Sequence, residues 1–461
     1  MWTKRRSSSS ARTEYFRKFL SSQARVTGIS ILATAALYTT TALYSQTQPV
    51  VNFNVPLKFN GTFNGGLPIG ELLLDSQGFV YGATTLGGEE YGECVPGPGC
   101  GVLYKWGHGR FTTVHDFTGQ NPSIFFPSSG LIRDAQGNLY GETNGSSNAG
   151  FGTVYRLDPA GNINPLHSFI EQESGPSGGL IQDAAGNLYG VTIGHCNSGS
   201  GCGEVFRINP AGSETVLYTF PSGGDEGSNP QSALVQDAQG NLYGTTPFGG
   251  TRINVNDTLG SGVLFKLTPS GKMTVLHYFN GTSDGARPTN IVRDPQGNLY
   301  GYASAGGCTL AAGCTSVGGS LAACTESGGC GVVYKYDTSG KFAVVYTFTG
   351  GTDGAVPVGI PLLIGDSIYG ATSSGAYQGN IYCSASDGCG VVFKLKLNGT
   401  ETVLHTFKGS GGDGMAPSSG LVVDEKGNFW GATSLGGARS HTLESCVEGC
   451  GTLYTFTLTN P

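Results

Sequence analysis

Twelve cysteines are the residues of this chain best suited to chemistry, and they come in closely spaced pairs. Five residues separate the members of five pairs, and three separate the members of the sixth. The pairs are Cys94 with Cys100, Cys196 with Cys202, Cys308 with Cys314, Cys324 with Cys330, Cys383 with Cys389, and Cys446 with Cys450. Tetrahedral zinc needs about four converging ligands, and pairs in different copies of the repeat described below are not expected to meet. We therefore predict disulfides, with three pairings open for the four cysteines within residues 302–330.

Acidic residues recur in a second kind of loop, each just before a glycine. They are Asp225, Glu226, Asp284, Asp353 and Asp413. A calcium ion takes six to eight oxygen ligands, which one acid in each loop does not supply. We interpret these acids as turn-forming residues that are also candidates for contact with a ligand.

Histidines offer little support for catalysis. His115, His167, His277 and His405 hold one repeated position, which is taken by Leu57, Tyr218 and Tyr346 in other copies of the repeat described below. A position shared by His, Tyr and Leu is typical of packing. The sequence shows no paired carboxylates at a shared repeat position, no nucleophile elbow and no metal-ligand cluster. We predict no catalytic, cofactor-binding or metal-binding residue.

The elements that must position these residues belong to a repeat. A Tyr-Gly or Trp-Gly step returns seven times, and a Gly-x-(Val/Leu)-(Tyr/Phe) motif follows each one. The steps begin at Tyr81, Tyr140, Tyr189, Tyr243, Tyr300, Tyr369 and Trp430. A period of roughly 50 to 70 residues is typical of propellers and solenoids.

Each copy divides into four short runs, A to D. In the fourth copy these are Ala233–Asp237, Asn241–Thr246, Val263–Leu267 and Met273–Phe279. An Asp-x-x-Gly turn links run A to run B, because its carboxylate accepts backbone N–H groups and its glycine adopts a positive φ. Four strands joined in this way form an antiparallel meander, which is one propeller blade.

The count of run D predicts how the repeat closes. Six copies end in run D, the seventh stops after run C, and Val55–Gly61 carries the missing pattern before the first run A. We therefore predict an all-β, seven-bladed propeller closed by strand 53–59 in its last blade, rather than an open solenoid with exposed edges. The predicted blades are 68–117, 128–169, 177–220, 231–279, 289–348, 358–407 and 418–458, within a repeat domain of residues 46–461.

These motifs resemble a known family. The patterns G-N-L-Y-G-T-T, G-x-V-F-K-L and T-V-L-H-x-F look like the tandem repeat named for Gloeobacter and Verrucomicrobia proteins, over nearly all of the chain from Asn52 onward. The resemblance implies a bacterial extracellular repeat protein that is exported. It names no ligand.

The first 45 residues differ in kind. A basic lead that includes Lys4, Arg5 and Arg6 precedes the mostly apolar run Ile29–Leu43, as in an export signal. The alternative is an uncleaved membrane anchor. Either one predicts a secreted, extracellular or cell-envelope location, with membrane contact only through this segment. The net charge of -7 disfavours a nucleic-acid partner.

Strand direction predicts where function lies. The B-to-C and D-to-A connections share one face, which we call the loop face, and the A-to-B and C-to-D turns share the other, the turn face. Variable loops on a rigid scaffold favour binding. The sequence therefore predicts a monomeric, non-catalytic binding or scaffold propeller without a cofactor, for a protein or glycan ligand. The alternative is a secreted polysaccharide lyase or hydrolase with its site at the loop-face mouth of the channel.

Overall fold

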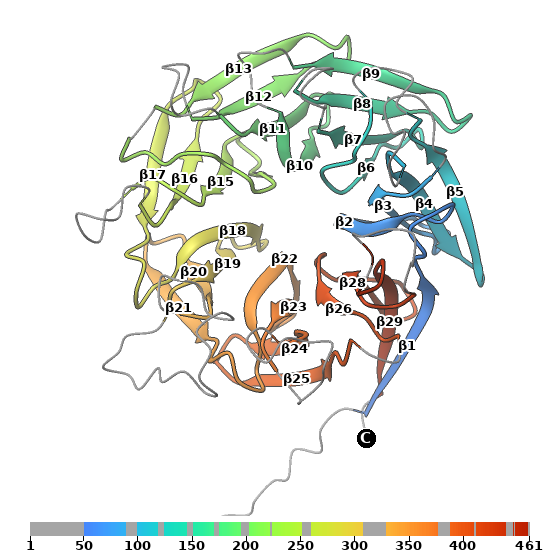
Figure 1. The fold of residues 1–461 in the computed structure, drawn as a ribbon. Coiled ribbons are helices and arrows are strands. Elements are labelled where there is room, and N and C mark those ends of the chain that lie inside the picture. The colour runs from blue at the N-terminus through green and yellow to red at the C-terminus, as the bar shows by residue number, and fades with distance from the viewer. Residues whose placement is uncertain are drawn as a thin grey trace, which may run out of the picture. The chain divides into compact units, whose positions relative to one another are not determined.

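A computed structural model of the protein shows a closed ring of seven β-sheets (Figure 1). The structure describes residues 50–88, 99–118, 124–144, 151–169, 175–194, 202–221, 224–250, 260–307, 329–376, 388–409, 412–438, 446 and 448–459. The predicted export segment 1–45 lies outside these residues. Among the described residues, no helix is long and apolar enough to cross a membrane.

Blades 1 to 6 each have four antiparallel strands in sequence order. The strands of blades 1 to 3 are β2 (Gly66–Leu74), β3 (Val80–Leu86), β4 (Val102–Gly107), β5 (Arg110–Asp116); β6 (Ile132–Arg133), β7 (Leu139–Thr143), β8 (Thr153–Leu157), β9 (Ile163–Ser168); β10 (Pro176–Gln182), β11 (Leu188–Thr192), β12 (Glu204–Ile208), β13 (Glu214–Thr219). Those of blades 4 to 6 are β14 (Val235–Gln236), β15 (Leu242–Thr246), β16 (Val263–Leu267), β17 (Met273–Tyr278); β18 (Ala286–Arg293), β19 (Leu299–Ala305), β20 (Val332–Tyr336), β21 (Phe342–Thr347); β22 (Ala355–Ile364), β23 (Ser367–Ser374), β24 (Val391–Lys396), β25 (Glu401–Thr406).

Blade 7 joins the two ends of the domain. It combines β26 (Met415–Pro417), β27 (Val422–Val423), β28 (Asn428–Leu435) and β29 (Thr452–Thr459) with β1 (Val50–Lys58). Strand β1 runs antiparallel to β29, with Phe53 opposite Phe456 and Leu57 opposite Leu453. The predicted closure of the ring by an N-terminal strand is therefore confirmed, although that strand begins three residues earlier than Phe53 and ends one residue before Phe59.

The core lies between neighbouring blades. The phenylalanine that ends each run D is at most 2% exposed, and its ring contacts the next blade: Phe117 packs against Tyr155, and Phe220 packs against Phe265. These rings exclude water from each joint and supply much of the apolar burial that stabilises the ring.

The innermost strands are less regular than the sequence predicts. In β2 the register with β3 shifts between Ile69 and Leu73, and the same place breaks the run-A strand of blade 7 into β26 and β27. The backbones approach closely at this bulge: a Cβ on Gly70, which has a φ of 70°, would lie 2.0 Å from the Gly130 nitrogen. Close packing of neighbouring blades at the ring centre thus requires glycine here.

Candidate functional site

A strained residue marks the loop-face end of nearly every innermost strand. Immediately before the proline that opens run A, six blades carry a non-glycine residue with φ between 52° and 57°, a region that residues other than glycine and asparagine rarely adopt. These residues are Leu67, Phe126, Asn229, Arg287, Val356 and Ala416. The blade 3 residue at this position is Gly175. Since run A is the innermost strand, these positions encircle the centre of the ring on the loop face.

Each strained residue is fixed to the preceding blade. The Val356 N–H donates to the Cys330 carbonyl over 2.9 Å, and the Ala416 N–H donates to the Cys389 carbonyl over 3.1 Å. The following proline packs against the glycine that opens run C of that blade: a Cβ on Gly390 would lie 2.9 Å from the Pro417 Cδ. The repeated Gly-x-(Val/Leu)-(Tyr/Phe) motif is therefore one half of a joint between blades.

The cysteines lie at the same joints. Five of them supply the carbonyl that accepts the strained N–H: Cys100, Cys202, Cys330, Cys389 and Cys450. Cys446 and Cys450 are joined in a disulfide. The other four are also disulfide-bonded, while the partners that the spacing predicts for them, and the pair Cys308 with Cys314, lie outside the described residues. Those five pairings stay predictions.

The side chains at the strained positions differ from blade to blade. Phe126 and Val356 are partly buried and pack against the blade cores. The Asn229 Oδ1 accepts the Gly194 N–H over 3.2 Å. Arg287 is exposed, and its guanidinium carbon lies 5.9 Å from the centre of the Phe248 ring. One backbone geometry thus presents apolar, polar and cationic groups around the ring.

The predicted loop-face acids do not converge at the centre; four of them contact run D of their own blade instead. The His277 Nε2 lies 2.9 Å from Asp284 Oδ2, and the His405 Nε2 lies 3.3 Å from Asp413 Oδ2. The Tyr346 hydroxyl donates to Asp353 Oδ2 over 3.0 Å, and the Tyr218 hydroxyl donates to Glu226. Asp225 is exposed. The acids and the run-D rings, which sequence reasoning took separately, therefore form pairs.

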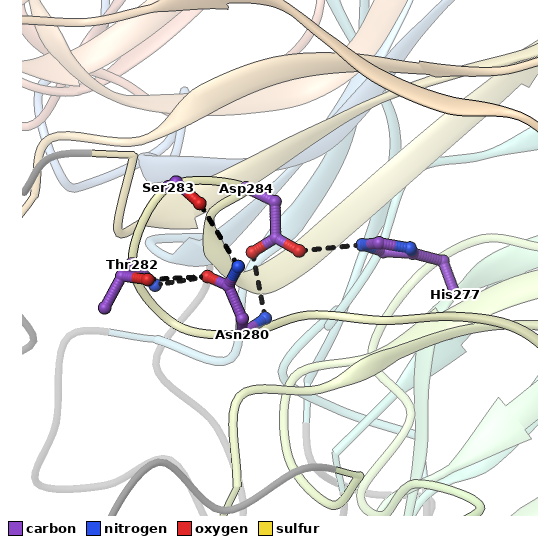
Figure 2. Close-up of polar contacts among 5 residues, drawn as sticks. All are labelled: His277, Asn280, Thr282, Ser283 and Asp284. Atoms are coloured by element: carbon purple, nitrogen blue, oxygen red, sulfur yellow. Dashed lines mark hydrogen bonds and ion pairs between the residues drawn. The ribbon is translucent and has the colours of Figure 1, made fainter.

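Figure 2 shows this pairing in blade 4. Asp284 Oδ1 accepts the Asn280 N–H over 2.9 Å, and Asn280 Oδ1 accepts both the N–H and the hydroxyl of Thr282 over 2.8 Å. The His277 ring stacks on Phe342 of blade 5 with 3.6 Å between ring centres. Asp284 orders the turn, as predicted, while its partner His277 packs between blades.

A signal in the sequence could have found these pairs. The ring and the acid are seven residues apart in blades 4 and 5, and eight apart in blades 3 and 6. Where Leu57 takes the ring's place, the residue seven positions later is Asn64, which carries no charge. The signal fails in blades 1 and 2, where His115 and His167 have no acid seven or eight residues later.

Two carboxylates lie nearer the centre. Glu71 lies on β2, the run-A strand of blade 1. It is partly buried and accepts backbone N–H groups from Ile360 and Gly420. Glu142 on β7 is fully buried and accepts the Gly179 N–H over 3.1 Å. Burial raises the pKa of each to about 7, although their hydrogen bonds act in the opposite direction.

Sequence reasoning missed Glu142. It occupies a run-B position held by Ala83, Val191 and Thr245 in other blades, and a lone acid among small residues was the available signal. No group of three or more His, Cys, Asp or Glu side chains that could hold a metal occurs within the described residues.

Known proteins resemble the chain in two ways. The Gloeobacter/Verrucomicrobia repeat matches residues 28–256 and 255–461. No curated protein matches in sequence. One similar solved structure is an oligogalacturonate lyase from Vibrio parahaemolyticus, with 9% identity and a TM-score of 0.51 over 89% of this chain and 98% of the lyase. Another is the extracellular domain of a two-component system from B. thetaiotaomicron, with 12% identity and a TM-score of 0.50 over 90% of this chain and 43% of that domain. The chain spans about two fifths of the length of such extracellular domains. At this identity the likeness shows the fold alone.

Proposed function

The chain belongs to the Gloeobacter/Verrucomicrobia repeat family, and from that premise we propose that it is an exported, non-catalytic binding or scaffold propeller. It holds a protein or glycan ligand on its loop face. It acts as a monomer, in secreted form or at the cell envelope.

The difference between the two faces supports this proposal. On the turn face, the acid of the A-to-B turn in six blades accepts the N–H of the residue four positions later, while blade 6 has a shorter turn at Gly365 and Asp366. In blade 4, Asp237 Oδ1 accepts two backbone N–H groups, and Oδ2 accepts from Asn241 and Tyr243. These groups satisfy one another and leave little for a ligand. The loop face instead presents different side chains in each blade, among them Phe63, which is 77% exposed.

Phe63 lies on a turn that is already ordered. The Asn60 Oδ1 accepts both the N–H and the hydroxyl of Thr62, and the Gly61 N–H donates to the Gly65 carbonyl over 2.9 Å. An exposed aromatic ring on an ordered turn loses little conformational entropy when a ligand covers it.

The observation that carries the proposal is the strained ring of positions. In six blades a non-glycine side chain adopts a left-handed conformation that costs on the order of 1 kcal/mol each, while Gly175 of blade 3 does not have a positive φ. The bonds to the preceding blade hold these positions in place, so the exposed side chain of Arg287 would lose little conformational entropy on binding a ligand.

A binding screen of the full chain against glycans and proteins tests the proposal. The loop-face variants are Arg287→Gly, which relieves strain while removing the cation, and Phe63→Ser, because Ser283 holds the same place in the blade 4 turn. The control is Lys272→Ser, an exposed residue of the turn face. We expect at least about tenfold weaker binding of the selected ligand by one loop-face variant and an unchanged affinity for the control.

Two outcomes contradict the proposal. Loss of binding in Lys272→Ser alone would place the ligand on the turn face. Cleavage of a polysaccharide without stoichiometric binding would favour the enzyme that the sequence left as an alternative.

A further inference from the structure

The bulge in the innermost strands leaves backbone N–H groups at the centre of the ring without a partner in their own sheet. In β22 the register with β23 shifts between Val358 and Leu362, and in β10 the register with β11 shifts between Ser177 and Ile181. The third residue after the strand-opening proline lies within this irregular segment. Its N–H needs an acceptor, because a backbone N–H that is buried without a hydrogen-bond partner is destabilising.

Three side chains from other blades supply that acceptor. Asn290 of blade 5 accepts the Ala233 N–H of blade 4 over 2.9 Å, and Glu142 of blade 2 accepts the Gly179 N–H of blade 3 over 3.1 Å. Each of these joins two adjacent blades. Both acceptors lie on strands that β-pairing already holds in place.

Glu71 differs because it joins three blades. From blade 1, its Oε1 accepts the Ile360 N–H of blade 6 and its Oε2 accepts the Gly420 N–H of blade 7, both over 2.8 Å. The donors are 289 and 349 residues away along the chain. A Cβ on Gly420 would lie 2.5 Å from Oε2, so the carboxylate reaches this N–H only because the residue is glycine.

We propose that Glu71 is a second closure of the ring, acting at its centre, and that its protonation sets how tightly blades 1, 6 and 7 hold together. Strand pairing between β1 and β29 closes the ring at its periphery. The carboxyl group spans the same joint from the inside, where no strand pairing exists between the described strands of neighbouring blades.

The surroundings of Glu71 make the closure sensitive to pH. The ionisable groups that face it are the hydroxyls of Tyr302 on β19 and Tyr454 on β29, both buried and neutral. Strand β22 carries no ionisable side chain, and neither does the segment 418–421. Because Glu71 is buried and no cationic side chain faces it, its pKa is raised to about 7.

The direction of the effect follows from linkage. When the centre opens, the carboxyl group returns to water and to its ordinary pKa of 4.5. The closed state therefore binds the proton more tightly, and opening becomes easier as the pH rises toward 7 and levels off above it. From pH 5.5 to 7.5 the opening equilibrium should rise about twentyfold.

Amide hydrogen exchange of the full chain, resolved to single residues, tests this inference. After correction for intrinsic exchange, protection of the Ile360 and Gly420 amides should fall about twentyfold from pH 5.5 to 7.5. The matched control is the Ala233 amide, which occupies the same strand position but donates to the neutral Asn290. Its protection should stay constant.

The variant Glu71→Gln should abolish the pH dependence and expose one of the two amides, since a carboxamide has only one acceptor oxygen. Constant protection of Ile360 and Gly420 in the wild type, or an equal fall at Ala233, would overturn the inference. So would an unchanged pH dependence in Glu71→Gln. The comparison within the wild-type protein remains decisive if that variant does not fold.

Discussion

The Leu67 N–H donates to the Cys450 carbonyl over 2.8 Å, and this bond ties the first innermost strand to the last loop of the ring. Its counterparts join other neighbouring blades, such as Phe126 to Cys100. Cysteine, glycine and proline therefore recur together because they form one joint. The carbonyl of the disulfide-bonded cysteine accepts the N–H of the residue before the proline, and that residue has a positive φ. The glycine has no Cβ and so leaves room for the proline ring.

Replacement of the joint's glycine should be costly. Gly451 has a φ of 99°, and an added Cβ would lie 2.5 Å from Pro68 Cδ and 2.3 Å from the Thr433 carbonyl oxygen. We expect Gly451→Ala to lower the free energy of unfolding by at least about 2 kcal/mol, since the clash adds to the backbone strain. Denaturant titration of the purified wild type and variant measures this difference in the free energy of unfolding.

Gly427→Ala is the matched control. Gly427 has a φ of 80°, and no atom lies within 4 Å of an added Cβ, so only the strain remains, at about 1 kcal/mol. Equal losses in the two variants would show that the contact with Pro68 contributes nothing.

The turn face should depend on the pairing of Asp237 with Tyr243. The tyrosine hydroxyl donates to Asp237 Oδ2 over 3.0 Å. Tyr243→Phe keeps the ring against Lys266 and should cost about 1 kcal/mol, while Asp237→Ala also frees two backbone N–H groups and should cost about 2 to 3 kcal/mol. A double-mutant cycle isolates the bond: strictly additive losses would deny that it couples the two residues.

The blades were predictable from sequence because the signals that specify them are local. Asp237, Gly240 and Tyr243 lie within seven residues, and their turn forms from that segment alone. Closure of the ring was also predictable, because the pattern around Leu57 and Phe59 matches run D of the other copies.

The contacts between blades could not be predicted in this way. The Ile360 and Gly420 N–H groups donate to Glu71 because the bulges place them beside its carboxylate. No residue type in the sequence predicts where these bulges place the N–H groups. The same holds for the positive φ of Val356 or Arg287, since both residues ordinarily avoid that conformation. The tertiary joint imposes it.

Removal of the described disulfide should loosen the joint of blades 7 and 1. Cys446 and Cys450 are fully buried, and Cys450 supplies the carbonyl for Leu67. We expect Cys446→Ser with Cys450→Ser to lower the free energy of unfolding by about 2 kcal/mol and to increase exchange of the Leu67 amide. The Val356 amide, bonded to Cys330, is the internal control. Unchanged exchange at Leu67 would mean that the disulfide does not support the carbonyl.

Glu142 should make the protein less stable as the pH rises. Its folded-state pKa is about 7 because of burial, against an ordinary value of 4.5, so the folded state binds more protons between these values. The stabilisation is complete below pH 4.5 and is lost as the pH rises toward 7, by up to about 3 kcal/mol. Glu142→Gln keeps an acceptor for the Gly179 N–H and cannot ionise. Relative to the wild type, the variant should therefore gain stability between pH 5 and pH 8 in denaturant titrations. A constant difference between the two proteins across that range would show that Glu142 does not titrate there.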